Sequence, residues 1–89
     1  MHLVLRGEVD LASTPILERE LKRAEATASG RIVLDLGELE FIDSSGLSCL
    51  MRAQQRASAN GHTLILKRIP AQAKRLFYLT GFDSGPAAD

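Results

Sequence analysis

The sequence predicts a small α/β domain in which a mostly parallel sheet alternates with helices. Residues 31–36 read RIVLDL and are apolar on nearly both sides, which is typical of a central parallel strand. Segments with apolar residues at helical spacing stand before and after this strand, so strands and helices alternate along the chain. A length of 89 residues favours one domain with a small core.

The N-terminal part is predicted to form a strand over His2–Val9 and then a helix. Apolar residues alternate across the two faces of this strand. Ser13 or Thr14 is a suitable N-cap, and Pro15 suits the first helical turn because no backbone N–H is needed there. Leu17 begins the apolar stripe of the predicted helix.

The part after the central strand is predicted to continue the alternation. We expect a loop over Gly37–Glu40, a second helix over Ser45–Ala59, a third strand over Thr63–Lys67 and a third helix over Ala71–Leu79. Strands that alternate with helices imply a parallel sheet with right-handed crossovers.

Two polar segments directly follow the first two predicted strands, at 7–10 and 39–45. The carboxyl ends of parallel strands lie at one edge of the sheet, where the sites of such folds gather. We therefore expect these two segments to meet, and Glu8 and Asp10 to contact a partner there or to be solvated turn residues.

The string Asp43-Ser44-Ser45-Gly46-Leu47 opens the second predicted helix. A helix start gathers unpaired N–H groups and the positive end of the helix dipole, so a hydroxyl there lies at a natural phosphate site. Ser44 is also a good N-cap, which would give it a structural role only. Asp43 is interpreted either as orienting the Ser44 hydroxyl or as a second cap.

The segment LDLGELEFIDSSGLSCLMRA resembles the signature of STAS domains, most closely that of the bacterial anti-sigma factor antagonists. Gly7-Glu8-Val9-Asp10 and the segment PAQAKRLFYLTG resemble two further parts of the family pattern, in the same order. The family usually has another strand before Leu3, and a strand and a helix after Gly81. The resemblance implies a single STAS-like domain over residues 1–83, shortened at both ends. Residues 84–89 are small and polar, which predicts a flexible tail.

The resemblance implies a function in binding, controlled by phosphorylation. Ser44 corresponds to the family's phosphorylated serine, and Ser45 is the second candidate acceptor. The implied partner is an anti-sigma factor with serine kinase activity, whose capture frees a sigma factor, and a phosphatase is a further partner. The residues expected to bind this partner are Glu8, Asp10, Asp43, Ser44, Ser45, Gly46 and Leu47. The alternative is an unphosphorylated STAS subunit of a membrane (lipid) transporter complex.

Composition and motif content argue against other functions. With 11 basic and 11 acidic residues the chain has no net charge, which does not favour nucleic-acid binding. No apolar run approaches the ~20 residues needed to span a bilayer, and no signal-peptide pattern is present, which favours the cytoplasm. His2 and His62 are poorly placed to act as a base for a serine, so we expect no enzyme, no metal site and no cofactor.

The predicted sheet is also expected to have an exposed edge. Only three strands are predicted, and the first of them begins at the N-terminus itself. Unpaired backbone groups at a sheet edge invite pairing with another chain. We expect a homodimer, a swapped element or protection of the edge by the tail.

Overall fold

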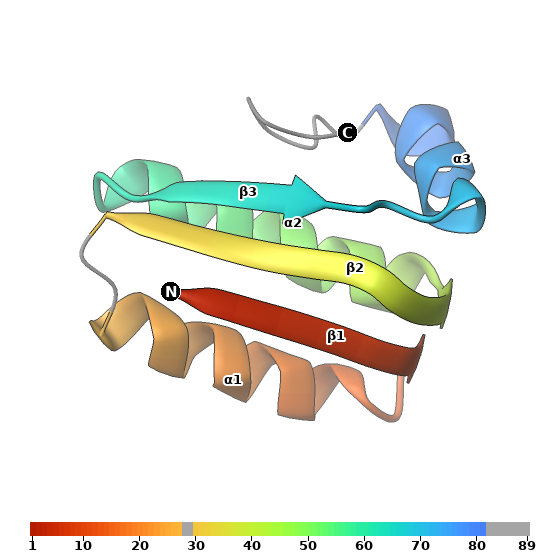
Figure 1. Ribbon diagram of the computed structural model, residues 1–89, viewed down its shortest axis with the longest axis horizontal. Helices are drawn as coiled ribbons and strands as arrows, with labels where there is room; N and C mark the ends of the chain where they lie inside the picture. Colours follow the sequence, from red (N-terminus) through yellow and green to blue (C-terminus); the bar gives the residue numbers. More distant parts are fainter. Residues whose placement is uncertain (28–29, 82–89) are drawn as a thin grey trace.

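The computed structural model of the chain describes residues 1–27 and 30–81. Its elements are β1 (His2–Val9), α1 (Thr14–Thr27), β2 (Arg31–Ile42), α2 (Ser44–Ala59), β3 (Thr63–Lys67) and α3 (Ala71–Thr80). The strands form a parallel sheet in the order β1-β2-β3 (Figure 1). The predicted alternation of strands and helices is confirmed, whereas the expected tail over 84–89 lies outside the described residues.

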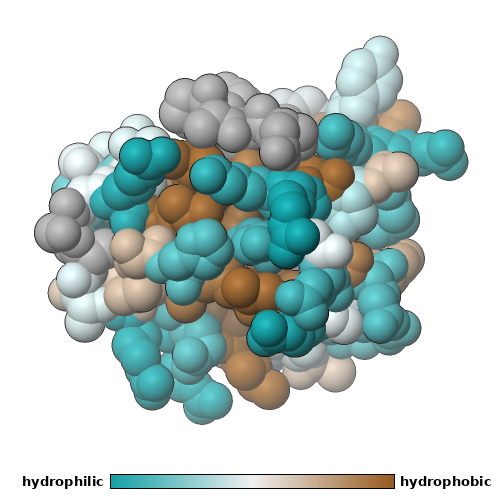
Figure 2. Space-filling view, viewed as in Figure 1, coloured by the Kyte–Doolittle hydropathy of each residue, from teal (hydrophilic) through white to brown (hydrophobic). Residues whose placement is uncertain are grey.

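Both crossover helices cover the same face of the sheet. The strands follow one another in chain order, so two right-handed crossovers step in the same direction and place α1 and α2 on one side. Figure 1 views the sheet from the other side, with α2 behind the strands. From this side, Figure 2 shows brown hydrophobic areas separated by teal hydrophilic ones.

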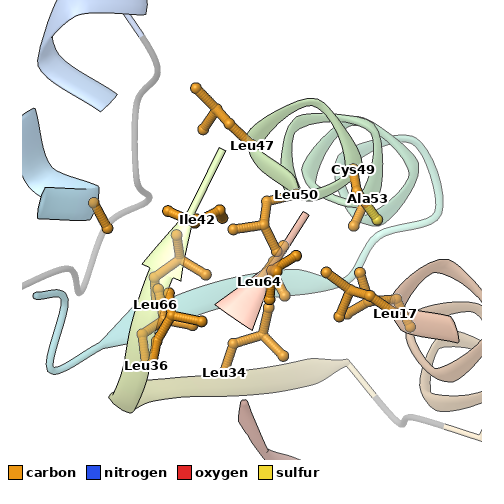
Figure 3. Packing of buried hydrophobic residues seen from close by; sticks show 14 of the residues in the cluster. Leu17, Leu34, Leu36, Ile42, Leu47, Cys49, Leu50, Ala53, Leu64 and Leu66 are labelled. Carbon is orange, nitrogen blue, oxygen red and sulfur yellow. The ribbon is translucent and has the colours of Figure 1, made fainter. Parts of the chain in front are cut away.

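The core lies between the sheet and these two helices. Alternate residues of β2 point into it, and Ile32, Leu34 and Leu36 are at most 1% exposed. Figure 3 shows Leu50 projecting from α2 toward the side chains of the sheet, near Leu64. Burial of each such side chain contributes about 1.5–3 kcal/mol, so this apolar layer supplies most of the force that holds α2 to the strands.

The prediction of a loop over Gly37–Glu40 is wrong, because β2 continues without a break to Ile42. The partner strand explains the difference: β1 pairs with β2 as far as Val9 opposite Ile42. The register shifts between Gly7 and Glu8, and the φ of +73° at Gly7 fits a bulge at that point. Pairing with a neighbouring strand thus overrides the poor strand propensity of Gly and Glu.

Candidate binding rim at the carboxyl edge of the sheet

The segments that follow β1 and β2 meet at the carboxyl edge of the sheet, as the sequence predicts. Val9 and Ile42, the last residues of the two strands, are register partners. The backbone N–H of Asp43 donates to the carbonyl oxygen of Val9 at 3.1 Å. We call the surface formed by Glu8, Asp10, Phe41, Asp43, Ser44 and Ser45 the rim.

Asp43 caps helix α2. Its backbone is extended, with φ −103° and ψ −175°, and its Oδ1 accepts the N–H of Gly46 at 3.0 Å. Its carbonyl oxygen accepts the N–H of Leu47, the first bond of the helix. Helical structure therefore begins at Ser44, one residue earlier than predicted. The interpretation of Ser44 as the N-cap is wrong, because the Asp43 side chain already fills that role.

Ser44 is the first helical residue and is exposed. Its hydroxyl makes no hydrogen bond to any part of the chain that the structure describes. Ser45, the second candidate acceptor, is only partly exposed. The hydroxyl of Ser44 is therefore open to a partner, and it stands at the end of α2 where a negative charge is favourable.

Gly46 and Leu47 lie beneath the rim rather than on it. Leu47 is 2% exposed and belongs to the core. A Cβ on Gly46 would lie 2.7 Å from both Ile42 Cγ1 and Val9 Cγ1, so a glycine lets α2 approach the two strand ends this closely. In this conformation these two residues fix how closely the start of α2 packs on the strand ends, and they offer a partner almost no surface.

Asp10 has a structural role in the turn after β1. Its Oδ1 accepts the N–H of Ser13 at 3.1 Å, and its own N–H donates to Ser13 Oγ at 2.9 Å. Ser13 directly precedes α1, and its carbonyl oxygen accepts the N–H of Leu17. Glu8, in contrast, is exposed near the end of β1. A partner-binding role for these two carboxylates stays a prediction.

Phe41 is a rim residue that the sequence analysis did not identify. Its side chain is 43% exposed, and it stands opposite Glu8 in the register of the two strands. Strand alternation is the signal that could have identified it, because Ile42 is fully buried and its neighbour must then point away. The exposed aromatic ring of Phe41 adds apolar contact area to the rim.

Cys49 and His62 have no place in the rim. Cys49 is fully buried, and its thiol donates to Glu18 Oε2 at 3.0 Å. Burial, reinforced by the Glu18 carboxylate, raises the pKa of the Cys49 thiol to about 12, which makes it a packing residue. His62 precedes β3, and therefore lies at the end of the parallel sheet opposite Ser44.

No helix within residues 1–27 and 30–81 is long and apolar enough to cross a bilayer.

Comparison with known proteins identifies the family. The family model described as "Mlab, STAS domain" matches residues 1–84. The putative anti-sigma factor antagonist BtrV of Bordetella bronchiseptica is 35% identical over 79 residues, which cover 88% of this chain and 67% of that protein. The anti-sigma-B factor antagonist of Bacillus subtilis is 32% identical over 78 residues, covering 86% of this chain and 70% of the relative.

Solved structures share the fold at lower identity. The anti-sigma factor antagonist SpoIIAA in its unphosphorylated form superimposes with a TM-score of 0.80 at 20% identity, covering 98% of this chain and 77% of that one. A sulfate transporter family protein from Wolinella succinogenes gives 0.66 at 17% identity, covering 91% and 67%. The order of strands and helices, the capped start of α2 and the match over residues 1–84 lead to one conclusion: the chain belongs to the STAS domain family.

Proposed function

We propose that this chain is an anti-sigma factor antagonist, a binding module rather than an enzyme, that acts in the cytoplasm. Its rim binds an anti-sigma factor with serine kinase activity and so releases a sigma factor for transcription. The names of two relatives that are 35% and 32% identical support this role. Phosphorylation of Ser44 by the bound kinase ends the interaction, and a phosphatase restores it.

The observation that carries the proposal is that Asp43 caps helix α2 whereas Ser44 has no structural hydrogen bond within the described residues. Asp43 supplies the cap, so the Ser44 hydroxyl has no structural bond to lose when it is modified. The N–H groups of the first helical turn point toward the same region, and the helix dipole favours negative charge there. A phosphate on Ser44 is therefore compatible with the folded domain.

The same phosphate is incompatible with a partner that binds the unmodified rim. It adds about 1.5 to 2 negative charges next to Asp43. A partner surface that closes on an uncharged hydroxyl has neither room for the phosphate nor a cation placed to meet its charge, so modification weakens binding. The switch thus acts by blocking the partner and leaves the fold intact.

The test is to incubate the chain with its cognate kinase and ATP and to map the modified residue by mass spectrometry. We expect a single phosphate on Ser44 and none in Ser44→Ala. Ser45→Ala and Ser48→Ala are matched controls, because Ser48 is exposed on the same helix one turn later. Modification confined to Ser45, or persisting in Ser44→Ala, would overturn the assignment.

The second candidate is an unphosphorylated STAS subunit of a membrane (lipid) transporter complex. It is favoured by the fold that this chain shares with a sulfate transporter family protein. In that role the rim packs on a partner subunit, and Ser44 remains unmodified. Affinity purification of the tagged chain from its source cell separates the two candidates, because it recovers either a serine kinase or a transporter ATPase.

A further inference from the structure

The side chain of Gln72 ties helix α3 to the end of β2. The backbone N–H of Ile42 donates to Gln72 Oε1 at 3.0 Å, and Gln72 Nε2 donates to the carbonyl oxygen of Ile42 at 2.9 Å. The side-chain amide of Gln72 therefore pairs both backbone polar groups of Ile42. Ile42 is the last residue of β2 and directly precedes the cap Asp43 and the acceptor Ser44.

The strand arrangement explains why Ile42 has this partner. On one side, β1 pairs with β2 as far as Ile42. On the other side, β3 pairs only with the first part of β2, from Arg31 to Asp35. Beyond Asp35 no described strand covers that side, so the Gln72 amide takes the place of the peptide group that a longer neighbouring strand would provide.

The start of α3 has a second attachment that is independent of Gln72. Arg68, in the connection from β3, donates through Nε and Nη2 to the two carboxylate oxygens of Asp35 at 2.8 and 2.9 Å. These bonds, followed by one from the N–H of Gly37, hold the pKa of Asp35 below its usual range. The ion pair keeps the connection on β2, so removing the Gln72 amide does not by itself detach the helix.

We propose that Gln72 is a positioning residue for the phosphoacceptor, an inference that rests on the proposed function. The N–H of Asp43 is held by Val9 from the β1 side, and Ile42 is held by Gln72 from the α3 side. The segment that directs Ser44 out of the sheet is therefore clamped from both sides. The orientation of this segment, and with it the position of the Ser44 hydroxyl, therefore depends on α3.

The variant that isolates this role is Gln72→Met. It keeps the length and apolar stem of the side chain and loses both hydrogen bonds. Gln72→Glu keeps an acceptor for the Ile42 N–H but places a carboxylate against the Ile42 carbonyl oxygen. Gln55→Met is the matched control, because Gln55 is exposed on α2 away from these contacts.

The measurements are the melting temperature, the amide hydrogen exchange of Ile42 and Gly46, and the kcat and KM of phosphorylation by the cognate kinase. In Gln72→Met we expect exchange at both amides to increase about tenfold or more, and kcat to fall about tenfold with a smaller change in KM. Small misplacements of a reacting group reduce the rate of the chemical step more than they reduce binding. Gln55→Met should match the wild type.

Wild-type kcat in a folded Gln72→Met variant would overturn the proposal, and so would unchanged exchange at Gly46. If Gln72→Met fails to fold, Gln72→Glu decides, with intermediate exchange and kcat supporting the clamp and wild-type values refuting it. A wild-type chain that the kinase does not phosphorylate refutes the proposed function. Exchange at Gly46 then still decides whether Gln72 positions the start of α2.

Discussion

At the scale of single residues, Asp43 and Ser44 are adjacent but have different roles, and substitutions should separate them. Ser44→Asp should stay folded, because a carboxylate in the first turn of a helix stabilises it by about 0.3–1 kcal/mol before repulsion from Asp43. Its affinity for the anti-sigma partner should fall by about thirtyfold to a few thousandfold, since an unpaired charge in an interface costs about 2–5 kcal/mol and each 1.4 kcal/mol is about tenfold.

Asp43→Ala is the matched contrast. It removes the acceptor of the Gly46 N–H and should reduce the free energy of unfolding by about 1 kcal/mol, while Asp43→Asn should recover most of this loss. Thermal melts and titration calorimetry measure both effects. Wild-type affinity in Ser44→Asp would refute the switch and favour the transporter subunit, and unfolding of Ser44→Asp would show that Ser44 is structural.

At the scale of elements, ion pairs between Arg56 of α2 and two glutamates of α1, Glu18 and Glu25, join the two helices beside the core. We call these pairs the seam. Arg56 of α2 donates to Glu25 at 2.8 and 2.9 Å and to Glu18 at 2.7 Å. Burial raises the pKa of Glu18, but the hydrogen bond from Cys49 and the charge of Arg56 outweigh it, so the pKa lies below its usual value. These pairs are partly buried, with 12% and 19% of the Glu25 and Glu18 side chains exposed.

Replacing Arg56 should therefore reduce the free energy of unfolding more than replacing a neighbouring exposed arginine does. Arg56→Ala removes both hydrogen bonds to the Glu25 carboxylate and one to Glu18, and should lower the free energy of unfolding by about 1–3 kcal/mol. Arg52→Ala is the control, because the Arg52 side chain is 55% exposed and its single 3.3 Å contact with Glu18 should contribute less than about 1 kcal/mol. Urea unfolding at neutral pH measures both, and equal losses would contradict the difference in burial.

At acid pH, Arg56→Ala should reduce the free energy of unfolding by less than it does at neutral pH. The pKa of Glu18 is lower in the folded protein than the ordinary value of 4.5, which applies to the unfolded chain. Such a carboxylate stabilises the fold fully above its unfolded pKa. This contribution is lost as the pH falls through the folded pKa. The wild type should therefore lose stability on acidification to about pH 3, and Arg56→Ala should lose less. Parallel pH dependences in the two proteins would show that the seam does not contribute through Glu18.

At the scale of the whole molecule, β1 forms an edge of the described sheet. The N–H of Val33 bonds to the carbonyl oxygen of Met1, so strand alternation turns the backbone groups of His2 and Val4 away from β2. Register shifts after Val4 and after Gly7 make the rest of the edge irregular, which weakens pairing with another chain. Any self-association through this edge should be weak and confined to its first half.

We therefore expect a concentration-dependent dimer in light scattering that Val4→Pro removes, because proline lacks the outward N–H. Circular dichroism confirms that the variant is folded. A wild-type chain that stays monomeric at high concentration, with nothing covering this edge, would contradict the prediction. A swapped element or cover by residues 84–89 remains the other expected form of protection.

The sequence alone determined the elements whose signals are local. Local sequence patterns predicted β1 and β3 with the bounds that the structure shows, and α3 to within one residue. The motif at Asp43 placed the start of α2 and the accessible Ser44 at the correct edge of the sheet. These features depend on the nearest neighbours in the chain, which is why local patterns are sufficient to predict them.

Only the tertiary structure decided the features that depend on distant partners. Gly37–Glu40 is strand because β1 pairs with it, and Phe41 is exposed because that pairing sets the register. Asp43 rather than Ser44 caps α2, since the Val9 carbonyl holds the Asp43 backbone N–H. Gln72 reaches Ile42 across thirty residues of sequence. No local pattern records such a contact, because its energy depends on which backbone groups the assembled sheet leaves unpaired.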